Sequence, residues 1–365
     1  MNNNLSLVID GTAYTGWKSA QIIRSIEAIC GGFSFAAGRQ YIADGDIIPI
    51  TPGMSCTVKY GNDTLITGYI DNVDPSGSPQ EHSITVSGRD KTQDLVDCSV
   101  IDCPAEFRNQ MLYTILWQII KPYGIKMAMA SGSYFTVEKF SISPGEKCFE
   151  AIDRLCRSVG FFPTVNFNGQ VVPARAGTVK IGKPLVYGRN IKTYSATCGI
   201  SERFSRYILL AQNTGSDNSD AATIAQIKAE ALDPSIYRNR TLKIIAEKAM
   251  TTAEAKIRAQ WEAAVRAGRS GSVNVTVQGW RDETGALWDH NKLIDIYLPP
   301  VFGSEFYQEF LIVSTSFSIS DKDGTTTQLT LRRKDSCLPE PLKAGKPGAV
   351  DPWSAIRKET GSTIR

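Results

Sequence analysis

Short segments in which apolar and polar residues alternate are the feature that most constrains this chain. Such a segment predicts a strand with one buried face, because successive side chains of a strand point to opposite faces. Five of them fall within the first 88 residues, at 5–9, 19–27, 54–60, 65–70 and 83–87. Asp10-Gly11 and Gly61-Asn62 lie between segments, at positions typical of hairpin turns. Strands this short and this evenly spaced predict an antiparallel barrel or sandwich over residues 1–88.

The periodicity changes from two to 3.6 in the next part of the chain. Four apolar residues recur at the spacing of one helix face, namely Leu112, Ile115, Leu116 and Ile119. Ser143-Pro144-Gly145-Glu146 has the form of a capping box and predicts the start of a second helix. Asn168-Gly169 predicts a type I′ turn between two strands, 161–167 and 170–174. Residues 89–180 are therefore predicted to form an α+β insert.

Alternating segments return after residue 180. They cover 192–198, 204–210, 272–280, 293–298, 310–318 and 325–332. Among them, Thr251-Thr252-Ala253-Glu254 is a capping box that opens a helix closed by Gly268, whereas the polar stretch 213–233 fits a loop or a marginal helix. Residues 181–334 thus predict a second β-barrel region with one long helix. No repeat between the two β regions is visible in the residues themselves.

The predicted fold class is mainly β with an α+β insert. A chain of 365 residues is longer than a typical single domain and predicts two to four. The segments above predict antiparallel β-barrel domains at 1–88 and 181–334, with a smaller α+β domain at 89–180 between them. Residues 335–365 contain four prolines and predict an extended C-terminal tail.

Composition excludes several classes of protein. Hydrophobic residues at 42% and charged residues at 21% are typical of chains that fold. Forty Lys and Arg against 37 Asp and Glu give a net charge of +3, too balanced for a protein that mainly holds phosphate backbones. No apolar run approaches the ~20 residues of a membrane span, and the start lacks the pattern of a secretory signal, so no membrane anchor is expected. The eight cysteines form no CxxC pair and predict reduced, mostly buried thiols.

Residues that carry enzyme chemistry are sparse. The two histidines, His82 and His290, have no partner at metal-ligand spacing and are predicted to be surface residues without a role. Residues 177–183 match the first seven positions of a phosphate-binding loop, but Pro184 stands where Ser or Thr must bind magnesium. A turn with a solvated lysine is therefore predicted there. The sequence predicts no catalytic, metal-binding or cofactor-binding residue, and no cofactor.

Aspartates near turns leave one catalytic alternative, because two suitably placed carboxylates are enough to hydrolyse a glycoside. The candidates are Asp44, Asp46, Asp71 and Asp74. Asp beside Gly or Pro is also ordinary turn chemistry, which is the favoured interpretation of these residues.

Five of the six tryptophans fall into two groups. Four lie at the edges of regular patterns and are predicted to be core, namely Trp17, Trp117, Trp261 and Trp280. Trp353 lies in the Pro-rich tail, with Ile356 three residues on. These two residues belong either to a disordered terminus or to an anchor that docks on a partner. They are the candidate partner-binding residues of the chain.

Several segments, in order along nearly the whole chain, resemble the baseplate hub family of Mu-like phages. They are Gly16-Trp17, RSIEAICGGFSF (24–35), GYID (68–71), VSGRDKTQDLVDCS (86–99), SPGEKCFEAIDRLCRSVG (143–160) and RAQWEAAVRAGRSGSVNVTVQGW (258–280). The hub of T4-like phages is more distantly similar. The tail, residues 335–365, matches the family least.

The resemblance implies a structural protein of a contractile tail and no catalytic residues. It implies a homotrimer in which each chain supplies two tube-like β-barrels, so that a pseudo-sixfold ring joins the sixfold tail tube to the threefold central spike and lets DNA pass. The implied partners are the tail tube or a tube-initiator protein, the spike and the baseplate wedge proteins. The implied location is the virion baseplate, after assembly in the host cytoplasm. Strand pairing from barrel to barrel is the expected way to close the ring.

Two other functions remain open on the sequence. One is a tail-associated cell-wall hydrolase that uses an Asp/Glu pair. The other is a polysaccharide-binding tail adhesin in which scattered Trp and Tyr form a sugar platform.

Overall fold

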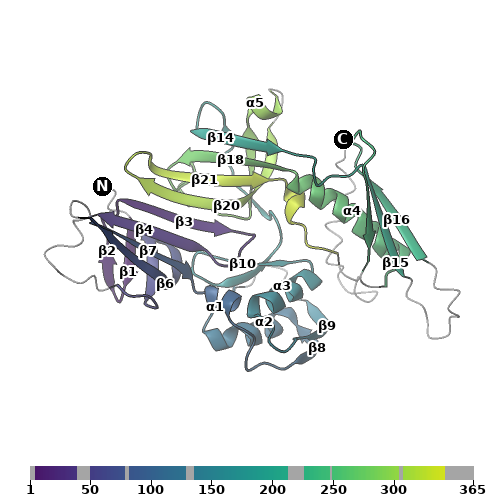
Figure 1. Ribbon diagram of the computed structural model, residues 1–365, viewed down its shortest axis with the longest axis horizontal. Coiled ribbons are helices and arrows are strands. Elements are labelled where there is room, and N and C mark those ends of the chain that lie inside the picture. The colour runs from purple at the N-terminus through teal and green to yellow at the C-terminus, as the bar shows by residue number, and fades with distance from the viewer. Residues whose placement is uncertain are drawn as a thin grey trace.

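The computed structural model of the chain describes residues 5–38, 50–78, 82–128, 135–212, 226–246, 249–303 and 307–341. Strands make up most of its regular structure, and the longer helices gather in the insert and beside a small outlying sheet (Figure 1). The predicted class, mainly β with an α+β insert, is confirmed. No helix among the described residues is long and apolar enough to cross a membrane.

Seven antiparallel strands form the N-terminal sheet. They are β1 (Leu5–Ile9), β2 (Thr12–Tyr14), β3 (Ser19–Ser25), β4 (Gly32–Gly38), β5 (Ser55–Tyr60), β6 (Asp63–Gly77) and β7 (His82–Asp90). Their order is β3-β4-β7-β6-β5-β1-β2. Asp10 and Gly11 both have positive φ, 48° and 81°, as a type I′ turn requires; the turn predicted at Asp10-Gly11 is confirmed, and it joins β1 to β2. The sequence pattern did not reveal β2, which is only three residues long, or β4, which begins and ends with glycine.

The insert has its own helical core. It contains α1 (Gln93–Asp97), β8 (Glu106–Met111), α2 (Leu112–Ile120), a 3-10 turn η2 (Lys121–Tyr123), β9 (Thr136–Ser141), α3 (Cys148–Ser158), β10 (Phe162–Val165) and β11 (Val171–Ala174). The predicted apolar stripe of α2 is confirmed, since Ile115, Leu116 and Ile119 are fully buried.

Two local predictions for the insert were wrong. The second helix begins at Cys148, because Ser143–Glu146 closes into a turn in which the Ser143 N–H donates to the Glu146 side chain at 2.9 Å. The β10–β11 hairpin exists, but its turn is not type I′. Gly169 has φ 71° while Asn168 does not have positive φ, and the Gly169 N–H donates to the Asn166 carbonyl at 3.0 Å.

The C-terminal sheet is built from strands that are dispersed along the second half of the chain. They are β12 (Val179–Lys180), β13 (Leu185–Val186), β14 (Thr193–Cys198), β18 (Gly271–Gln278), β19 (Lys292–Tyr297), β20 (Gln308–Ser320) and β21 (Gly324–Arg332). Two short elements accompany them, α5 (Pro299–Phe302) and the 3-10 turn η4 (Lys334–Cys337). Residues 177–183 lead into β13 and not into a helix, and Lys180 pairs with Asp295 and Glu309, each at 2.8 Å. They do not form a phosphate-binding loop.

The two sheets are one continuous sheet of 14 strands. Its order is β14-β18-β21-β20-β3-β4-β7-β6-β5-β1-β2, with β19 also paired to β20 and with β12 and β13 paired to β19. The antiparallel pairing of β20 with β3 is the junction, which we call the seam. Figure 1 shows β20 and β3 side by side across the middle of the molecule.

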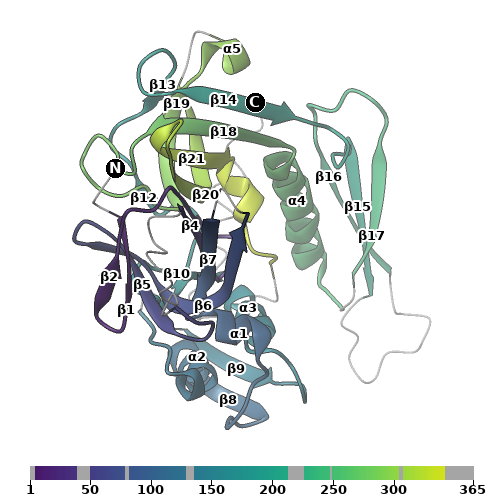
Figure 2. The same cartoon turned by 60° about the vertical axis from the view of Figure 1, so that its left-hand side comes forward.

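A third, smaller sheet lies apart from the seam, with a long helix beside it (Figure 2). It consists of β15 (Arg206–Gln212), β16 (Gln226–Leu232) and β17 (Thr241–Ile245), and the helix is α4 (Thr252–Arg269). The end of stretch 213–233 is therefore a strand, paired along β15, and not a helix. The Thr251 capping box is confirmed by mutual bonds between Thr251 and Glu254. Gly268 lies inside α4 and not after it, where an added Cβ would come within 2.4 Å of the Ser336 nitrogen.

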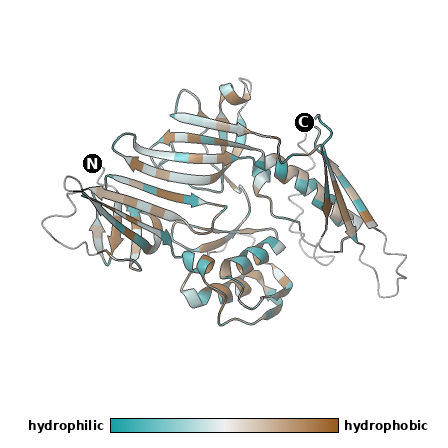
Figure 3. Ribbon diagram, in the orientation of Figure 1, coloured by the Kyte–Doolittle hydropathy of each residue, from teal (hydrophilic) through white to brown (hydrophobic). Residues whose placement is uncertain are grey.

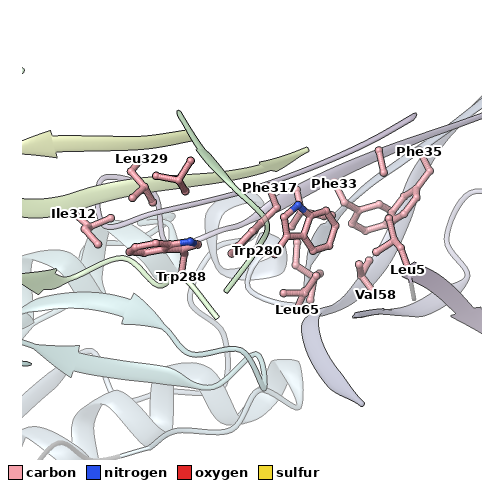
Figure 4. Close-up of a cluster of buried hydrophobic side chains, with 14 of the residues drawn as sticks. Leu5, Phe33, Phe35, Val58, Leu65, Trp280, Trp288, Ile312, Phe317 and Leu329 are labelled. Atoms are coloured by element: carbon pink, nitrogen blue, oxygen red, sulfur yellow. The ribbon is translucent and has the colours of Figure 1, made fainter. Parts of the chain in front are cut away.

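One apolar core extends beneath both large sheets. Brown, apolar residues alternate with paler ones along the strands of Figure 3, and Figure 4 shows aromatic and aliphatic side chains from both sheets meeting. Trp280 is 1% exposed, and its ring lies 4.6 Å from that of Tyr60 and 5.3 Å from that of Phe317. Because Tyr60 belongs to the N-terminal sheet and Phe317 to the C-terminal sheet, Trp280 joins their cores.

The predicted core tryptophans divide by burial. Trp17 and Trp280 are buried, as predicted. Trp117 is 37% exposed, because it lies on α2 away from the buried stripe, on the same face as Tyr113 four residues before it. Trp261 is only half-buried, with its indole N–H donating to the Leu338 carbonyl at 3.0 Å. The prediction was therefore wrong for Trp117 and only partly right for Trp261.

Candidate functional site: the seam and the free strand edges

The seam forms because β20 is longer than the strands beside it. One edge of β20 pairs with β21 along almost its whole length. On the other edge, Gln308–Leu311 pair with β19, and Ser314–Ile319 pair with β3. A register shift between Ile312 and Ser314 marks the change of partner. A bulge bends a strand, so this irregularity allows β20 to leave one sheet and enter the next.

The N-terminal sheet contains the same arrangement around β6. Strand order β3-β4-β7-β6-β5 corresponds to β14-β18-β21-β20-β19, and every neighbouring pair is antiparallel in both. The first half of β6 pairs with β5, a register shift follows between Ile70 and Asn72, and the second half pairs with β7 only. The two sheets are therefore structural copies of each other.

Backbone contacts agree residue by residue between the copies. Tyr69 lies opposite Ser55 and Arg89, as Leu311 lies opposite Leu293 and Arg332. A further pair of contacts also matches: the Lys18 N–H donates to the Ala36 carbonyl and the Lys192 N–H to the Thr276 carbonyl, both at 2.8 Å. Gly53 lies two residues before Ser55 of β5, and Asn291 lies two residues before Leu293 of β19; both have positive φ, and their N–H groups donate to the bulged strand, to the Ile70 and Ile312 carbonyls respectively.

A buried arginine fastens the seam to the insert. Arg24, on β3, is 4% exposed and donates from Nη1 to Asp289 Oδ1 at 2.9 Å. Its Nη2 donates to the Val165 carbonyl at 2.7 Å, and its guanidinium lies 3.8 Å from the centre of the Phe167 ring. Val165 and Phe167 belong to the β10–β11 hairpin and Asp289 to the C-terminal sheet region, so one side chain ties together all three large parts of the chain.

His290 lies in the same cluster and is 7% exposed, so the prediction of a surface histidine was wrong. Its Nε2 is 2.8 Å from Thr164 Oγ1, and its Nδ1 is 3.1 Å from Asp289 Oδ1. Burial lowers the pKa of His290, and the positive charge of Arg24 adds to this, while Asp289 opposes it. Burial acts to raise the pKa of Asp289, but His290 and Arg24 outweigh it and lower that pKa overall. His82, by contrast, is exposed at the start of β7, as predicted.

Thr164, His290 and Asp289 follow the order of a nucleophile, base and acid, but they are not placed for catalysis. Thr164 and His290 are each 7% exposed, and Asp289 is engaged by Arg24. A catalytic hydroxyl must meet a substrate carbonyl and an oxyanion-stabilising group in an accessible site. The cluster instead has the burial and pairing of a structural junction.

The predicted carboxylate candidates do not form a pair. Asp71 binds Arg89 Nε at 2.7 Å, and Arg89 also holds Asp97 at 2.9 Å. Asp74 lies exposed on the second half of β6, and Asp44 and Asp46 lie outside the described residues. Among the described residues, no group of three or more His, Cys, Asp or Glu side chains is arranged to hold a metal ion.

The described cysteines are free thiols, as predicted, although only Cys56, Cys148 and Cys156 are fully buried. Burial raises the pKa of Cys56 to about 12 and that of Cys148 to about 11, so both remain protonated at neutral pH. Cys198, on β14, is the exposed one.

Among the strand edges that the described chain leaves unpaired, two correspond to the two sides of the seam. All six residues of β14, Thr193–Cys198, are exposed, and its only ladder is with β18. On β6, residues 72–77 pair with β7 alone, and all but the half-buried Val73 are exposed. Unpaired edges bind other strands readily, so these are the candidate interaction sites. Trp353 and Ile356 lie outside the described residues.

The fold just described, two matched antiparallel sheets with an α+β insert, is that of phage tail hub proteins. The chain is 33% identical to the 43 kDa tail protein of prophage MuSo2 from Shewanella oneidensis, with a TM-score of 0.81 over 91% of this chain and 99% of that one. A tail protein of Neisseria meningitidis gives a TM-score of 0.75 at 22% identity, over 92% of this chain and 99% of that one. A component of the type VI secretion system of E. coli shares the fold at a TM-score of 0.52 and 11% identity, over 92% and 79% of the two chains.

Sequence comparison identifies the family. Residues 4–90 match the N-terminal domain of the Mu phage GpP-like baseplate assembly proteins, 92–175 the second domain of gp44-like baseplate hub proteins, and 251–340 the GpP fourth domain. Baseplate hub protein gp44 of Escherichia phage Mu is 30% identical over 345 residues, which cover 93% of this chain and 90% of gp44. The chain belongs to the Mu-type baseplate hub protein family and is a structural component of the phage tail baseplate in the virion.

Proposed function

We propose that three copies of this chain form a pseudo-sixfold ring on the axis of the tail baseplate. Each copy would contribute its N-terminal and C-terminal sheets, so that six similar units surround a central channel. The sixfold face would receive the tail tube or a tube-initiator protein, and the threefold face the central spike. Wedge proteins would attach around the outside, and DNA would pass through the ring during ejection.

The observation that supports this proposal most directly is the internal duplication of the sheet. Two structural copies in one chain, joined edge to edge, present two nearly equivalent surfaces per protomer. Closed rings are the usual result when such surfaces are repeated by rotation. Three protomers with two units each supply six positions, which allows a threefold protein to match a sixfold one.

The charge balance agrees with a conduit, as does the lack of catalytically placed groups in the part of the chain that the structure describes. A net charge of +3 over 365 residues gives little attraction for passing DNA, whereas a strongly basic channel would hold it. The buried Arg24 cluster stiffens the junction of the parts, which suits a ring that transmits axial force. No enzymatic activity is proposed.

The experiment is to measure the mass and symmetry of the purified chain, alone and with its spike protein. A trimer has a mass of three times 39.9 kDa, about 120 kDa, which light scattering resolves from a monomer. End-on electron microscopy should show six similar lobes around a central hole. A particle that stays monomeric with the spike present, or a threefold particle without six lobes, would contradict the proposal.

The same preparation separates the other functions. A cell-wall hydrolase would clear a peptidoglycan suspension, and an adhesin would bind purified lipopolysaccharide. We expect neither with the trimer.

We further propose that the tail beyond Pro341 carries a partner anchor formed by Trp353 and Ile356. The described chain ends three residues after Leu338, whose carbonyl accepts a hydrogen bond from the Trp261 indole on α4. Deleting residues 342–365 should leave the trimer intact and weaken binding of a spike or wedge protein. Loss of the trimer on deletion would instead place the tail within the ring.

A further inference from the structure

We infer that β14 of one protomer pairs, antiparallel, with residues 72–77 of β6 in the next protomer. This interface rests on the proposed ring and specifies how its copies join. It would repeat between chains the seam that β3 and β20 form within one chain.

The strand correspondence selects both partners. β3 is the first strand of the N-terminal sheet, and its equivalent is β14, while the half of β20 that receives β3 is equivalent to residues 72–77 of β6. The seam places Thr315 opposite Arg24 and Ser316 opposite Ile23. If β14 pairs with β6 in the same register as β3 pairs with β20, Val73 lies opposite Cys198 and Asp74 lies opposite Thr197.

Equivalent residues on one face of the two first strands differ in exposure. On β3, which β20 covers, Ala20, Ile22 and Arg24 are at most 5% exposed. Their equivalents on β14 are all exposed, among them Tyr194 at 36%. The strand reads Thr-Tyr-Ser-Ala-Thr-Cys, without the charged residues or proline that usually protect a free edge from pairing.

The backbone groups of both edges point the right way. Within the seam the Ile26 N–H donates to the Val313 carbonyl at 2.9 Å, so every second residue from Val313 onward turns its amide toward β3. Thr315, Phe317 and Ile319 are three of these residues. The residues of β6 at the equivalent positions are Val73, Pro75 and Gly77. On β14, the Gly199 N–H donates to Ser270, toward β18, which turns the amide of Ala196 outward.

Pro75 then lies where its nitrogen faces the incoming strand. The ladder loses one donor there, and the Pro75 carbonyl remains available to the Ala196 N–H. Proline in a sheet is confined to such edge positions, and it also discourages pairing with unrelated strands.

A head-to-tail contact of this kind uses a different surface on each side, and it closes into a ring when the rotation permits. In a trimer, three seams would lie within chains and three between them. Every β14 edge and every 72–77 edge of the three chains would then be paired.

The first test is a cysteine cross-link in the full-length chain, with Cys198→Ser as background. Asp74→Cys and Thr197→Cys would face each other in a non-hydrogen-bonded pair, about 4.5 Å between Cα atoms, a distance that a disulfide spans. Mild oxidation should give covalent dimers and trimers on a denaturing gel. The matched control, Asp74→Cys with Ser195→Cys, is shifted by two residues and should cross-link at least about tenfold more slowly, since diagonal neighbours lie about 7–8 Å apart.

A trimer by light scattering that forms no cross-link, or that cross-links equally in the control, would overturn the interface and leave the proposed ring standing. If no trimer forms even in the Cys198→Ser background with spike present, the proposed function itself fails.

The second test blocks the edge without cysteines. Ala196→Pro removes an amide that points away from β18, so the fold of the monomer should persist, while the trimer dissociates. Ala196→Val keeps the amide and should remain trimeric. A trimeric Ala196→Pro variant would contradict the pairing, and circular dichroism shows whether both variants fold.

Discussion

The N-terminal and C-terminal sheets have the same backbone plan and almost unrelated side chains. Phe33 and Phe35 occupy the core of the first sheet, and Val273 and Val275 occupy the equivalent positions of the second. All four are at most 4% exposed. The alternation of buried and exposed positions is preserved, while the volumes are not. Strand order, register and the bulge therefore define this unit, and many different packings can fill it.

The two sheets differ most at their first strands. β3 is covered by β20 of the same chain, whereas β14 has no cover among the described residues. The first strand of the N-terminal sheet is therefore paired at its outer edge, and the first strand of the C-terminal sheet is not, within the described residues. If the two sheets act as one unit, loss of a contact between them should weaken both.

Replacing Trp280 by Ala should cost about 3–5 kcal/mol of unfolding free energy, as large-to-small changes of a buried aromatic do. Because its ring contacts Tyr60 and Phe317, both sheets should lose stability in a single shared transition, followed by fluorescence and circular dichroism in urea. Tyr237→Ala, at a residue 97% exposed, is the control and should change little. Two separate transitions would show that the sheets unfold independently.

Replacing Arg24 by Met should cost about 3 kcal/mol, because Asp289 would keep a largely buried charge without its partner. The double variant Arg24→Met, Asp289→Leu should recover part of that loss, so the two single effects should not add. Urea unfolding of the four proteins measures the coupling. Strict additivity would mean that the pair does not fasten the seam.

Replacing Trp261 by Ala should cost about 1–2 kcal/mol, less than a core tryptophan, since the side chain is half-buried. The change removes its bond to Leu338 and the stacking of Arg258 over its ring, 4.6 Å from the centre. Hydrogen exchange should accelerate in α4 and η4 and stay unchanged in β4. Equal acceleration in β4 would mean that α4 belongs to the shared core.

Lowering the pH should weaken the seam by about 1 kcal/mol. The pKa of His290 is lowered by burial from an ordinary value of 6.5, so below pH 6.5 the unfolded chain takes up a proton that the folded protein does not. Stability therefore falls as the pH falls, by at most about 1.4 kcal/mol per pH unit for one group. Urea unfolding at pH 7.5 and 5.5 should show this loss in the natural protein and a smaller one in His290→Gln. Burial raises the pKa of Asp90, so Asp90 also makes stability depend on pH. Its contribution is the same in both proteins and cancels when their pH-dependent losses are subtracted. Identical pH dependence would mean that His290 is reached by water.

Local patterns determined much of the fold from the sequence alone. Alternation located most strands, Asp10-Gly11 located a turn, and the Thr251–Glu254 box located the start of α4, because each depends on residues a few positions apart. The collinear motifs also indicated the hub family. Local signals were misleading where a short motif fits two structures. Ser143–Glu146 fits both a helix cap and a turn, and it forms a turn before α3.

Tertiary structure decided which elements meet. The burial of His290 depends on Thr164 and Arg24, residues 126 and more positions away along the chain. The duplication of the sheets was equally invisible, because it resides in backbone register and in buried positions that accept Phe as readily as Val. A sequence pattern reports which side of a strand is apolar. Which strand lies beside it follows from long-range packing, and that packing created both the seam and the free edge of β14.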